Sequence, residues 1–359
     1  MTRPARVVID LAALEHNFHR VRELAPHSKV MAVVKADAYG HGISRIARKL
    51  AAADAFGVAC LEEARELRSA GIQQRIVLLE GPYASNELDE IARLDLDIVV
   101  HHQSQVEMLE GCTLPGQVTV WLKIDSGMHR LGFQEFEFET IYQRLLDCTA
   151  VAGNIVLMTH LALASDRHND MTESQLDCFT RICKGLDAEK SIANSAAVLA
   201  FADSHADWVR PGLMLYGVSP LSDSLSNDEG LIPVMTLESR LIAVKMLKAN
   251  DPVGYGATYR CPEDMRVGVV AAGYGDGYPR HAPSGTPVLV NGKRVTLIGR
   301  ASMDMLTVDL RELPEADVGD PVILWGRGLP VEEVANHAGT IAYELLCGVH
   351  KRLQFTENG

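Results

Sequence analysis

The chain of 359 residues lacks the features that mark several classes of protein. Its seven cysteines are odd in number and scattered without a CxxC pair, so a disulfide framework and a zinc site are both poorly supported. The net charge of −13 argues against a nucleic-acid-binding surface and against binding to anionic membranes. No apolar run is long enough to cross a bilayer, and the first residues lack the apolar core of a signal peptide. We therefore expect a cytoplasmic protein with reduced thiols and no metal site.

Short apolar runs rich in β-branched residues alternate with amphipathic segments from residue 30 to about 217. Continuous apolar strands separated by such helices are typical of a parallel sheet. Eight units favour a closed (β/α)8 barrel of the TIM type over an open sheet. The expected strands are Val30–Val34, Phe56–Cys60, Arg75–Leu79, Asp97–His101, Val118–Ile124, Asn154–His160, Ser191–Asn194 and Trp208–Tyr216. The expected helices include Ile43–Ala53, Leu61–Ala70, Ala84–Leu94, Phe136–Leu146 and Thr172–Leu186.

The pattern changes beyond Pro220 to short alternating strands with turn signals, which predicts a mainly β second domain. Asn291-Gly292 is a strong hairpin signal, because this pair favours a type I′ turn. We expect a barrel domain over residues 1–230 and a β domain over 231–359, and leave open whether residues 1–25 pack with the second domain. The strands expected in the β domain are Met235–Val244, Arg266–Ala272, Val288–Val290, Val295–Ile298, Met305–Leu310 and Pro321–Trp325, with Val331–His337 as its only helix; Arg6–Ile9 and Leu11–Leu24 are a strand and a helix ahead of the barrel.

The most informative segment is VVKADAYGHG, residues 33–42. Lys35 stands where an apolar strand gives way to a glycine-containing loop. A lysine in that place is partly desolvated, which makes its amine more nucleophilic, as a Schiff-base lysine requires. The segment also agrees with a surface lysine that caps a strand.

Other polar residues follow later strands of the predicted barrel. In a TIM-type barrel, function lies on the loops after the carboxyl ends of the strands, and phosphate sites are commonly built after strands seven and eight. His160 ends the sixth expected strand, Ser195 follows the seventh, and Arg210 lies in the eighth, where Gly212 lets the backbone approach an anion. Each has an ordinary alternative: His160 as a buried core histidine, Arg210 as an ion-pair residue, and Ser195 as a helix cap.

Together these motifs resemble those of alanine racemases along almost the whole chain and in that family's order. The segments that carry the resemblance, besides VVKADAYGHG, are LKIDSGMHRLG (122–132), NSAAVL (194–199), DWVRPGLMLYG (207–217), PVGYGATY (252–259), GYGDGYPR (273–280), GRASMDM (299–305) and AYELLC (342–347).

The resemblance implies pyridoxal 5′-phosphate (PLP) as the cofactor and alanine as the substrate. Lys35 would hold PLP through a Schiff base and share acid–base work with Tyr255 on opposite faces of the substrate. The other implied cofactor-binding residues are Tyr39, His160, Asn194, Ser195, Arg210, Gly212, Leu213 and Tyr343. Arg130 and Met303 would contact the substrate carboxylate or its surroundings, and the supporting or entrance residues are Lys123, Tyr274, Arg280 and Asp304.

Two of these positions carry a specific chemical expectation. Arg210 would face the pyridine nitrogen of PLP, and because arginine keeps its proton, the carbanion would be less delocalised into the ring, which favours simple reprotonation. Lys123 matches a lysine that is carbamylated in some members, which would place a negative charge beside Arg130. One position departs from the family, since Ser165 stands where an aspartate is usual, and this concerns the entrance loop.

The family further implies a homodimer in which Tyr255 reaches the partner's cofactor, with D-alanine made for peptidoglycan or alanine degraded. The closest alternative is an amino-acid racemase of broader substrate range. A non-catalytic PLP-binding barrel would end before the β domain that carries PVGYGATY. A related decarboxylase would have a glycine-rich phosphate loop in place of NSAAVL, and a PLP-free Schiff-base aldolase would not need Ser195, Arg210 and Tyr343.

Overall fold

The computed structural model describes residues 3–358. The chain divides into two compact units, which are described separately. The barrel unit comprises Asn17–Leu215 and Ser219–Ser224, and the β unit contains the residues up to His16, Tyr216–Val218 and the residues from Leu225 onward. None of the described helices is both long and apolar enough to span a membrane.

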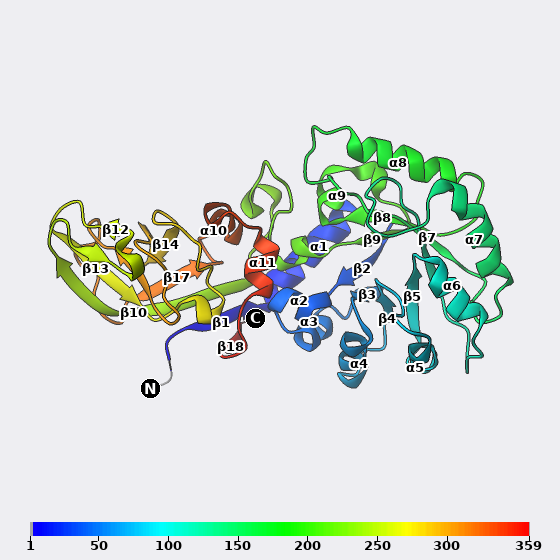
Figure 1. Ribbon diagram of the computed structural model, residues 1–359, viewed down its shortest axis with the longest axis horizontal. Coiled ribbons are helices and arrows are strands. Elements are labelled where there is room, and N and C mark those ends of the chain that lie inside the picture. The colour runs from blue at the N-terminus through cyan, green and yellow to red at the C-terminus, as the bar shows by residue number, and fades with distance from the viewer. Residues whose placement is uncertain (1–2, 359) are drawn as a thin grey trace. The chain divides into compact units, whose positions relative to one another are not determined.

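The barrel unit is built on eight parallel strands that close into a barrel in chain order, with the last strand pairing back to the first. Figure 1 shows the helices α4 to α8 outside this ring of strands. Because both faces of each strand are covered, the strands are apolar and almost wholly buried. The strands are β2 (Lys29–Val33), β3 (Ala55–Val58), β4 (Arg75–Leu78), β5 (Leu96–Val100), β6 (Val120–Lys123), β7 (Val156–Met158), β8 (Lys190–Asn194) and β9 (Trp208–Arg210).

The barrel interior is packed with side chains rather than hollow. Met31, Val99, Trp121 and Trp208 belong to one buried cluster, in which the two indole rings meet edge to face at 5.2 Å. The helices of the unit are α2 (Lys35–Gly40), α3 (Ile43–Lys49), α4 (Leu61–Ser69), α5 (Leu88–Arg93), α6 (Gln103–Glu110), α7 (Glu135–Asp147), α8 (Met171–Ile182) and α9 (Ser195–Ala200), and α1 (Leu11–Leu24) precedes β2.

The β unit contains an eight-stranded sheet in which six strands follow the order β15-β14-β17-β10-β1-β18, while β13 pairs with β10 and β16. Strand β1 lies antiparallel to β10 and parallel to β18. The predicted hairpin is present, with Asn291 and Gly292 both at positive φ (51° and 75°). The elements are β1 (Arg6–Asp10), β10 (Met235–Leu247), β11 (Pro252–Val253), β12 (Tyr259–Arg260), β13 (Met265–Val270), β14 (Pro287–Val290), β15 (Lys293–Thr296), β16 (Leu306–Asp309), β17 (Pro321–Trp325), α10 (Val331–Ala338), α11 (Ala342–Cys347) and β18 (Gln354–Asn358).

The predicted barrel followed by a mainly β domain is confirmed, and a few elements differ from expectation. The strand expected over Trp208–Tyr216 ends at Arg210, because Pro211 has no N–H to continue the ladder, and Leu213–Tyr216 forms a 3-10 helix instead. The helix expected over 84–94 is a 3-10 turn followed by α5. Val331–His337 is not the only helix of the β unit, since α11 follows it.

Candidate active site

Five basic side chains gather at the carboxyl ends of the barrel strands. Lys123 ends β6 and Arg210 ends β9, whereas Lys35 and His160 lie two residues beyond the ends of β2 and β7. The strands therefore stop earlier than the sequence pattern indicates for these two residues. Burial and the positive charges of Arg210, Lys123, Arg130 and Lys35 lower the pKa of His160 well below its ordinary value. The imidazole is therefore neutral, and the four cationic side chains are near enough for their charges to act on it.

Arg210 is buried inside this group of cations. Its Nη1 donates to Ser191 Oγ at 2.6 Å, and its Nη2 donates to the carbonyls of Thr159 at 2.6 Å and Ile192 at 3.1 Å. Burial lowers the pKa of the guanidinium to about 10, which leaves it charged at neutral pH. Within residues 3–358 no carboxylate pairs with it. The charge is therefore held by neutral oxygens and remains available to a ligand.

The contact between Arg210 and His160 fixes the histidine tautomer. Arg210 Nη2 lies 3.3 Å from His160 Nδ1. A guanidinium can only donate, so Nδ1 accepts, and a neutral ring then carries its proton on Nε2. The Nε2–H of His160 is thus a hydrogen-bond donor, and the contact of Arg210 with Nδ1 holds the ring in place.

Lys123 is a buried amine without a counter-charge. Burial is the main cause that lowers its pKa to about 8, and the charges of Arg210, Arg130 and Lys35 add to it. The charge of Glu80 has a weaker, opposite effect on this pKa. In the part of the chain that the structure describes, Lys123 forms no ion pair. A larger share of this amine is uncharged at neutral pH than of an ordinary lysine.

The loop that carries Arg130 is folded around the carboxylate of Asp125. That carboxylate accepts from the amides of Gly127 at 3.1 Å and His129 at 2.9 Å, and from His129 Nδ1 at 3.0 Å. Burial alone would raise the pKa of Asp125, but these hydrogen bonds lower it overall. The loop after β6 is therefore held in one shape, with Arg130 exposed at its end.

A polar cradle lies after β8 and β9. Ser195 Oγ accepts from the amides of Gly212 at 2.8 Å and Met214 at 3.3 Å. A Cβ at position 212 would lie 2.5 Å from the Tyr39 hydroxyl, so only glycine permits this approach. Asn194 caps α9 by accepting from Ala197 N at 3.1 Å. A second bond of Asn194, from Nδ2 to Leu161 O at 3.2 Å, holds the loop beyond His160, while the buried Leu213 follows Gly212.

The segment that connects Lys35 to Tyr39 is a single left-handed turn. Ala36 to Tyr39 have φ of 53° to 54° and ψ of 41° to 51°. For residues other than glycine this conformation costs roughly 1–2 kcal/mol each. Fixed partners hold the turn: Glu63 accepts from Ala36 N at 2.6 Å, and Asp37 Oδ1 accepts from Ile43 N at 2.8 Å.

His41 closes the same turn. It is fully buried, and burial lowers its pKa to about 4. Its Nδ1 lies 2.9 Å from the carbonyls of both Ala38 and Tyr39. Carbonyls only accept, so Nδ1 carries the proton of the neutral ring. His41 belongs to the motif singled out from the sequence, but its bracing role depends on the left-handed turn, which no sequence pattern announces.

The remaining predicted residues belong to the β unit. Tyr255 is 70% exposed and begins a short 3-10 turn. Gly254, just before the turn, and Gly256 and Ala257, within it, all have positive φ. Arg280 lines a cavity of about 470 Å³, and Tyr343 lies on α11. In the barrel unit, the carbonyl of Ser165 accepts from the amide and the hydroxyl of Ser222, both at 3.0 Å.

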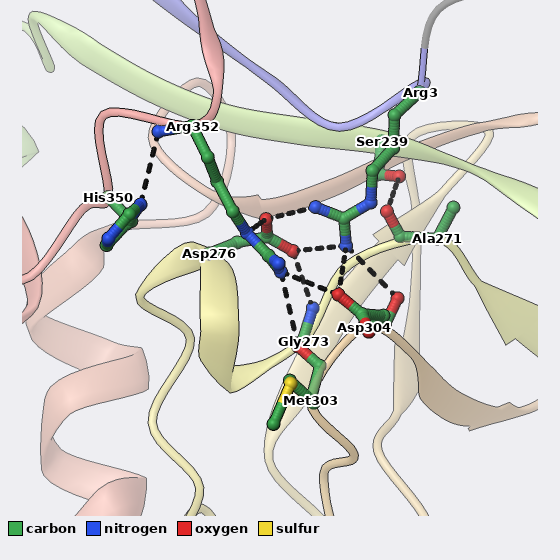
Figure 2. A network of polar contacts seen from close by, with 9 residues as sticks. All are labelled: Arg3, Ser239, Ala271, Gly273, Asp276, Met303, Asp304, His350 and Arg352. Atoms are coloured by element: carbon green, nitrogen blue, oxygen red, sulfur yellow. Dashed lines mark hydrogen bonds and ion pairs between the residues drawn. The ribbon is translucent and has the colours of Figure 1, made fainter.

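Met303 and Asp304 lie together within the β unit (Figure 2), and Tyr274 is hydrogen-bonded to the residue before them. Tyr274 N donates to Ser302 O at 3.0 Å, and Gly275 N donates to Met303 O at 2.9 Å. Behind them lies a network of Arg3, Asp276 and Arg352, which the sequence analysis did not single out. The motif GYGDG contains Asp276, but its two arginines come from positions 273 residues before and 76 residues after it.

A barrel with a lysine, a neutral histidine and arginines without carboxylate partners at the carboxyl ends of its strands has the arrangement of an enzyme site. Comparison with known proteins identifies the family of the chain. Profiles of the alanine racemase N-terminal and C-terminal domains match residues 9–220 and 234–356. The alanine racemase of Shewanella denitrificans is 53% identical over 352 residues, which cover 97% of each chain, and that of Halorhodospira halophila is 52% identical over 99% and 98%. The chain belongs to the alanine racemase family and is an isomerase.

Solved structures agree with this assignment. The biosynthetic alanine racemase of Pseudomonas aeruginosa superimposes with a TM-score of 0.97 at 45% identity, and the match covers all of both chains. The alanine racemase of Bartonella henselae with covalently bound pyridoxal phosphate gives 0.90 at 27% identity, covering 99% of this chain and 100% of that one.

The residues present fit PLP, the known cofactor of this family. The cofactor needs an amine, a pocket for its phosphate and a partner for its ring nitrogen. Lys35 would supply the amine, and Arg210 offers a buried charge that no carboxylate of the described residues pairs with. The close approach of Tyr39 to Gly212, which a Cβ would fill, provides a cradle beside Ser195.

Proposed function

We propose that this protein interconverts L- and D-alanine with PLP held on Lys35. The observation that carries this proposal is the cluster of Lys35, Lys123, Arg130 and Arg210 around the neutral His160. In a chain with a net charge of −13, four cations that form no ion pair within the described residues suit a ligand that brings phosphate and carboxylate groups.

The residues that would hold the cofactor divide by the part that they contact. Tyr39, Ser195, Gly212 and Leu213 would bind the phosphate, with Asn194 and Tyr343 beside them. Arg210 would face the pyridine nitrogen. When bound, PLP supplies the electron sink that stabilises a carbanion at the substrate Cα.

Racemisation needs a proton donor and acceptor on each face of Cα. Lys35 would serve one face and Tyr255 the other. The tautomer of His160 supports this assignment, because its Nε2–H can donate to a tyrosine oxygen while Arg210 holds the ring. The phenolate of Tyr255 would be stabilised by this chain of donors.

The substrate carboxylate would be bound by Arg130 and by the segment at Met303, which is 53% exposed. Lys123 would act through Arg130. With a pKa of about 8, its amine can react with carbon dioxide to form a carbamate and release a proton, and the negative charge would then neutralise part of the cation cluster. Tyr274, Arg280 and Asp304 would line the entrance.

We further propose a homodimer with shared sites, in which Tyr255 of one protomer serves the cofactor of its partner. The division of the chain supports sharing, since Lys35 belongs to the barrel unit and Tyr255 to the β unit. The protein would act in the cytoplasm, supplying D-alanine for peptidoglycan or degrading alanine. An amino-acid racemase of broader substrate range is the alternative, and a substrate panel separates the two.

Reduction of the protein with borohydride tests the assignment of Lys35. Borohydride fixes the cofactor to the amine that holds it, so peptide mapping should find the pyridoxyl group on Lys35 and the visible absorbance band should disappear. Lys35→Ala should lose essentially all racemisation and keep its circular dichroism spectrum, since the barrel core does not include this side chain. Label on Lys123 instead would overturn the assignment.

A further inference from the structure

Asp276 is a fully buried carboxylate in the β unit, and two arginines bind it (Figure 2). Arg3 donates to both carboxylate oxygens, through Nη1 and, at 2.7 Å, through Nη2. Arg352 donates through Nε at 2.9 Å, and Gly273 N donates at 2.9 Å. A buried carboxylate requires such partners, and here every lone-pair direction is used.

The same two arginines extend beyond Asp276 to the segment Met303–Asp304. Arg3 Nη2 donates to the Asp304 carbonyl at 3.2 Å. Arg352 Nη2 donates to Asp304 Oδ1 at 2.8 Å and lies 3.4 Å from the Met303 carbonyl. The two arginines thus connect the buried Asp276 carboxylate to a partly exposed loop, in which the Asp304 side chain is 51% exposed.

The backbone next to Asp276 lies directly against this loop. A Cβ at Gly273 would lie 2.2 Å from the Ser302 carbonyl and 2.5 Å from the Met303 carbonyl. Gly275 N also donates to Met303 O. Position 303 is therefore held from two sides, by the glycine-containing turn and by the arginines.

We propose that Arg3 and Arg352, anchored on Asp276, are positioning residues that hold the Met303 segment in the place where it meets the substrate carboxylate. Planar guanidinium groups suit this task, because each binds two groups at once in a fixed geometry. The inference rests on the proposed contact between Met303 and the substrate.

Either arginine can be replaced while the Asp276 carboxylate keeps other hydrogen-bond donors. In Arg3→Ala the carboxylate keeps Arg352 and Gly273 N, and in Arg352→Ala it keeps Arg3 and Gly273 N. Their side chains are only 34% and 33% exposed, so the bonds are shielded from water more than those of an ordinary surface pair. A matched control is Arg6→Ala, three residues along the chain, whose ion pair with Glu238 does not involve the loop.

The test measures kcat and KM in both directions, together with the melting temperature, for the PLP-loaded enzyme and its variants. We expect Arg3→Ala and Arg352→Ala to raise KM roughly three- to tenfold, because displacement of a substrate-contacting segment weakens binding, with kcat changed by less than about twofold. Arg352→Lys should recover only part of the loss, and Arg6→Ala should leave KM unchanged.

A fourth variant separates this inference from the function on which it rests. Met303→Asp places a negative charge at the segment and should raise KM by repelling the substrate carboxylate. If Met303→Asp raises KM while both arginine variants lower only the melting temperature, the network is merely structural and the inference is wrong. If Met303→Asp leaves KM unchanged, the proposed contact at Met303 is wrong.

Discussion

The proposed site contains cationic side chains that form no ion pair with a carboxylate of the described residues. Arg210 and Lys123 are both buried, and repulsion among the neighbouring cations adds to the effect of burial on the pKa of Lys123. A stable protein tolerates such a cluster when a ligand or a modification supplies the missing negative charge.

Lys123 offers a direct test at this scale. Its pKa of about 8 means that the uncharged amine becomes more abundant as the pH rises from 7 to 9. Only the uncharged amine adds carbon dioxide, so at constant dissolved carbon dioxide the carbamate should increase over that range. Carbon-13 NMR with labelled carbon dioxide measures it.

Lys123→Arg serves as the control, because a guanidinium keeps its charge at this position and forms no carbamate. The variant should lack the signal at every pH. A wild-type spectrum without a carbamate resonance above pH 8 would contradict the prediction.

Among the elements, the left-handed turn at Ala36–Tyr39 is the most unusual. It places residues other than glycine where glycine is favoured, beside the lysine that would hold the cofactor. Strain of this kind persists only where the surroundings impose it, and Glu63 and His41 do so here.

Ala36→Gly should therefore stabilise the protein or leave its stability unchanged. Glycine relieves roughly 1–2 kcal/mol of left-handed strain and costs about 0.5–1 kcal/mol of unfolded-state entropy. Ala36 is exposed, so no packing is lost. Ala12→Gly, an exposed alanine of the right-handed helix α1, is the matched control and should destabilise by about 0.5–1 kcal/mol. Denaturant unfolding gives both values, and equal destabilisation of the two variants would contradict the prediction.

Elements set by local pattern were predictable from the sequence. The barrel strands are continuous apolar runs, and the hairpin at Asn291-Gly292 follows from the turn preference of that pair. Strand β18 was not predicted, because its polar sequence QFTEN becomes a strand only by pairing with β1, nearly the whole chain away. The six-residue helix α11 is too short for its periodicity to be read.

The residues of the candidate site were likewise predictable from the sequence only where they depend on a local pattern. Lys35, His160 and Arg210 were singled out because they follow strands of a barrel whose pattern is local. The contacts that hold Arg210 were missed, since Ser191 Oγ comes from β8 and the Thr159 carbonyl from the residue after β7, both far from Arg210 in the sequence. The roles of Tyr255 and Met303 came from the family resemblance, because nothing in the local sequence relates them to the barrel.

At the scale of the whole molecule, the proposed shared site can be tested by mixing subunits. Lys35→Ala and Tyr255→Phe should each be nearly inactive. When the two variants are co-expressed, about half of the dimers should be mixed, each with one intact site, so activity should recover to roughly a quarter of wild type. Mixed dimers that form without recovering activity would show that both residues serve the site from one chain.

The pairing of β1 with β10 and β18 also has a consequence for the order in which the protein is made. All eight barrel strands, from residue 29 to residue 210, are synthesised before either neighbour of β1. Seven of the eight barrel pairings join strands that follow one another in the chain, so they can form before β1 has a neighbour. Strand β1 gains β10 as its first neighbour, and it gains β18 only when the last strand has been made. A chain that stops short of residue 352 would contain all eight barrel strands and lack one of the two arginines that bind Asp276, so translation would complete this network last.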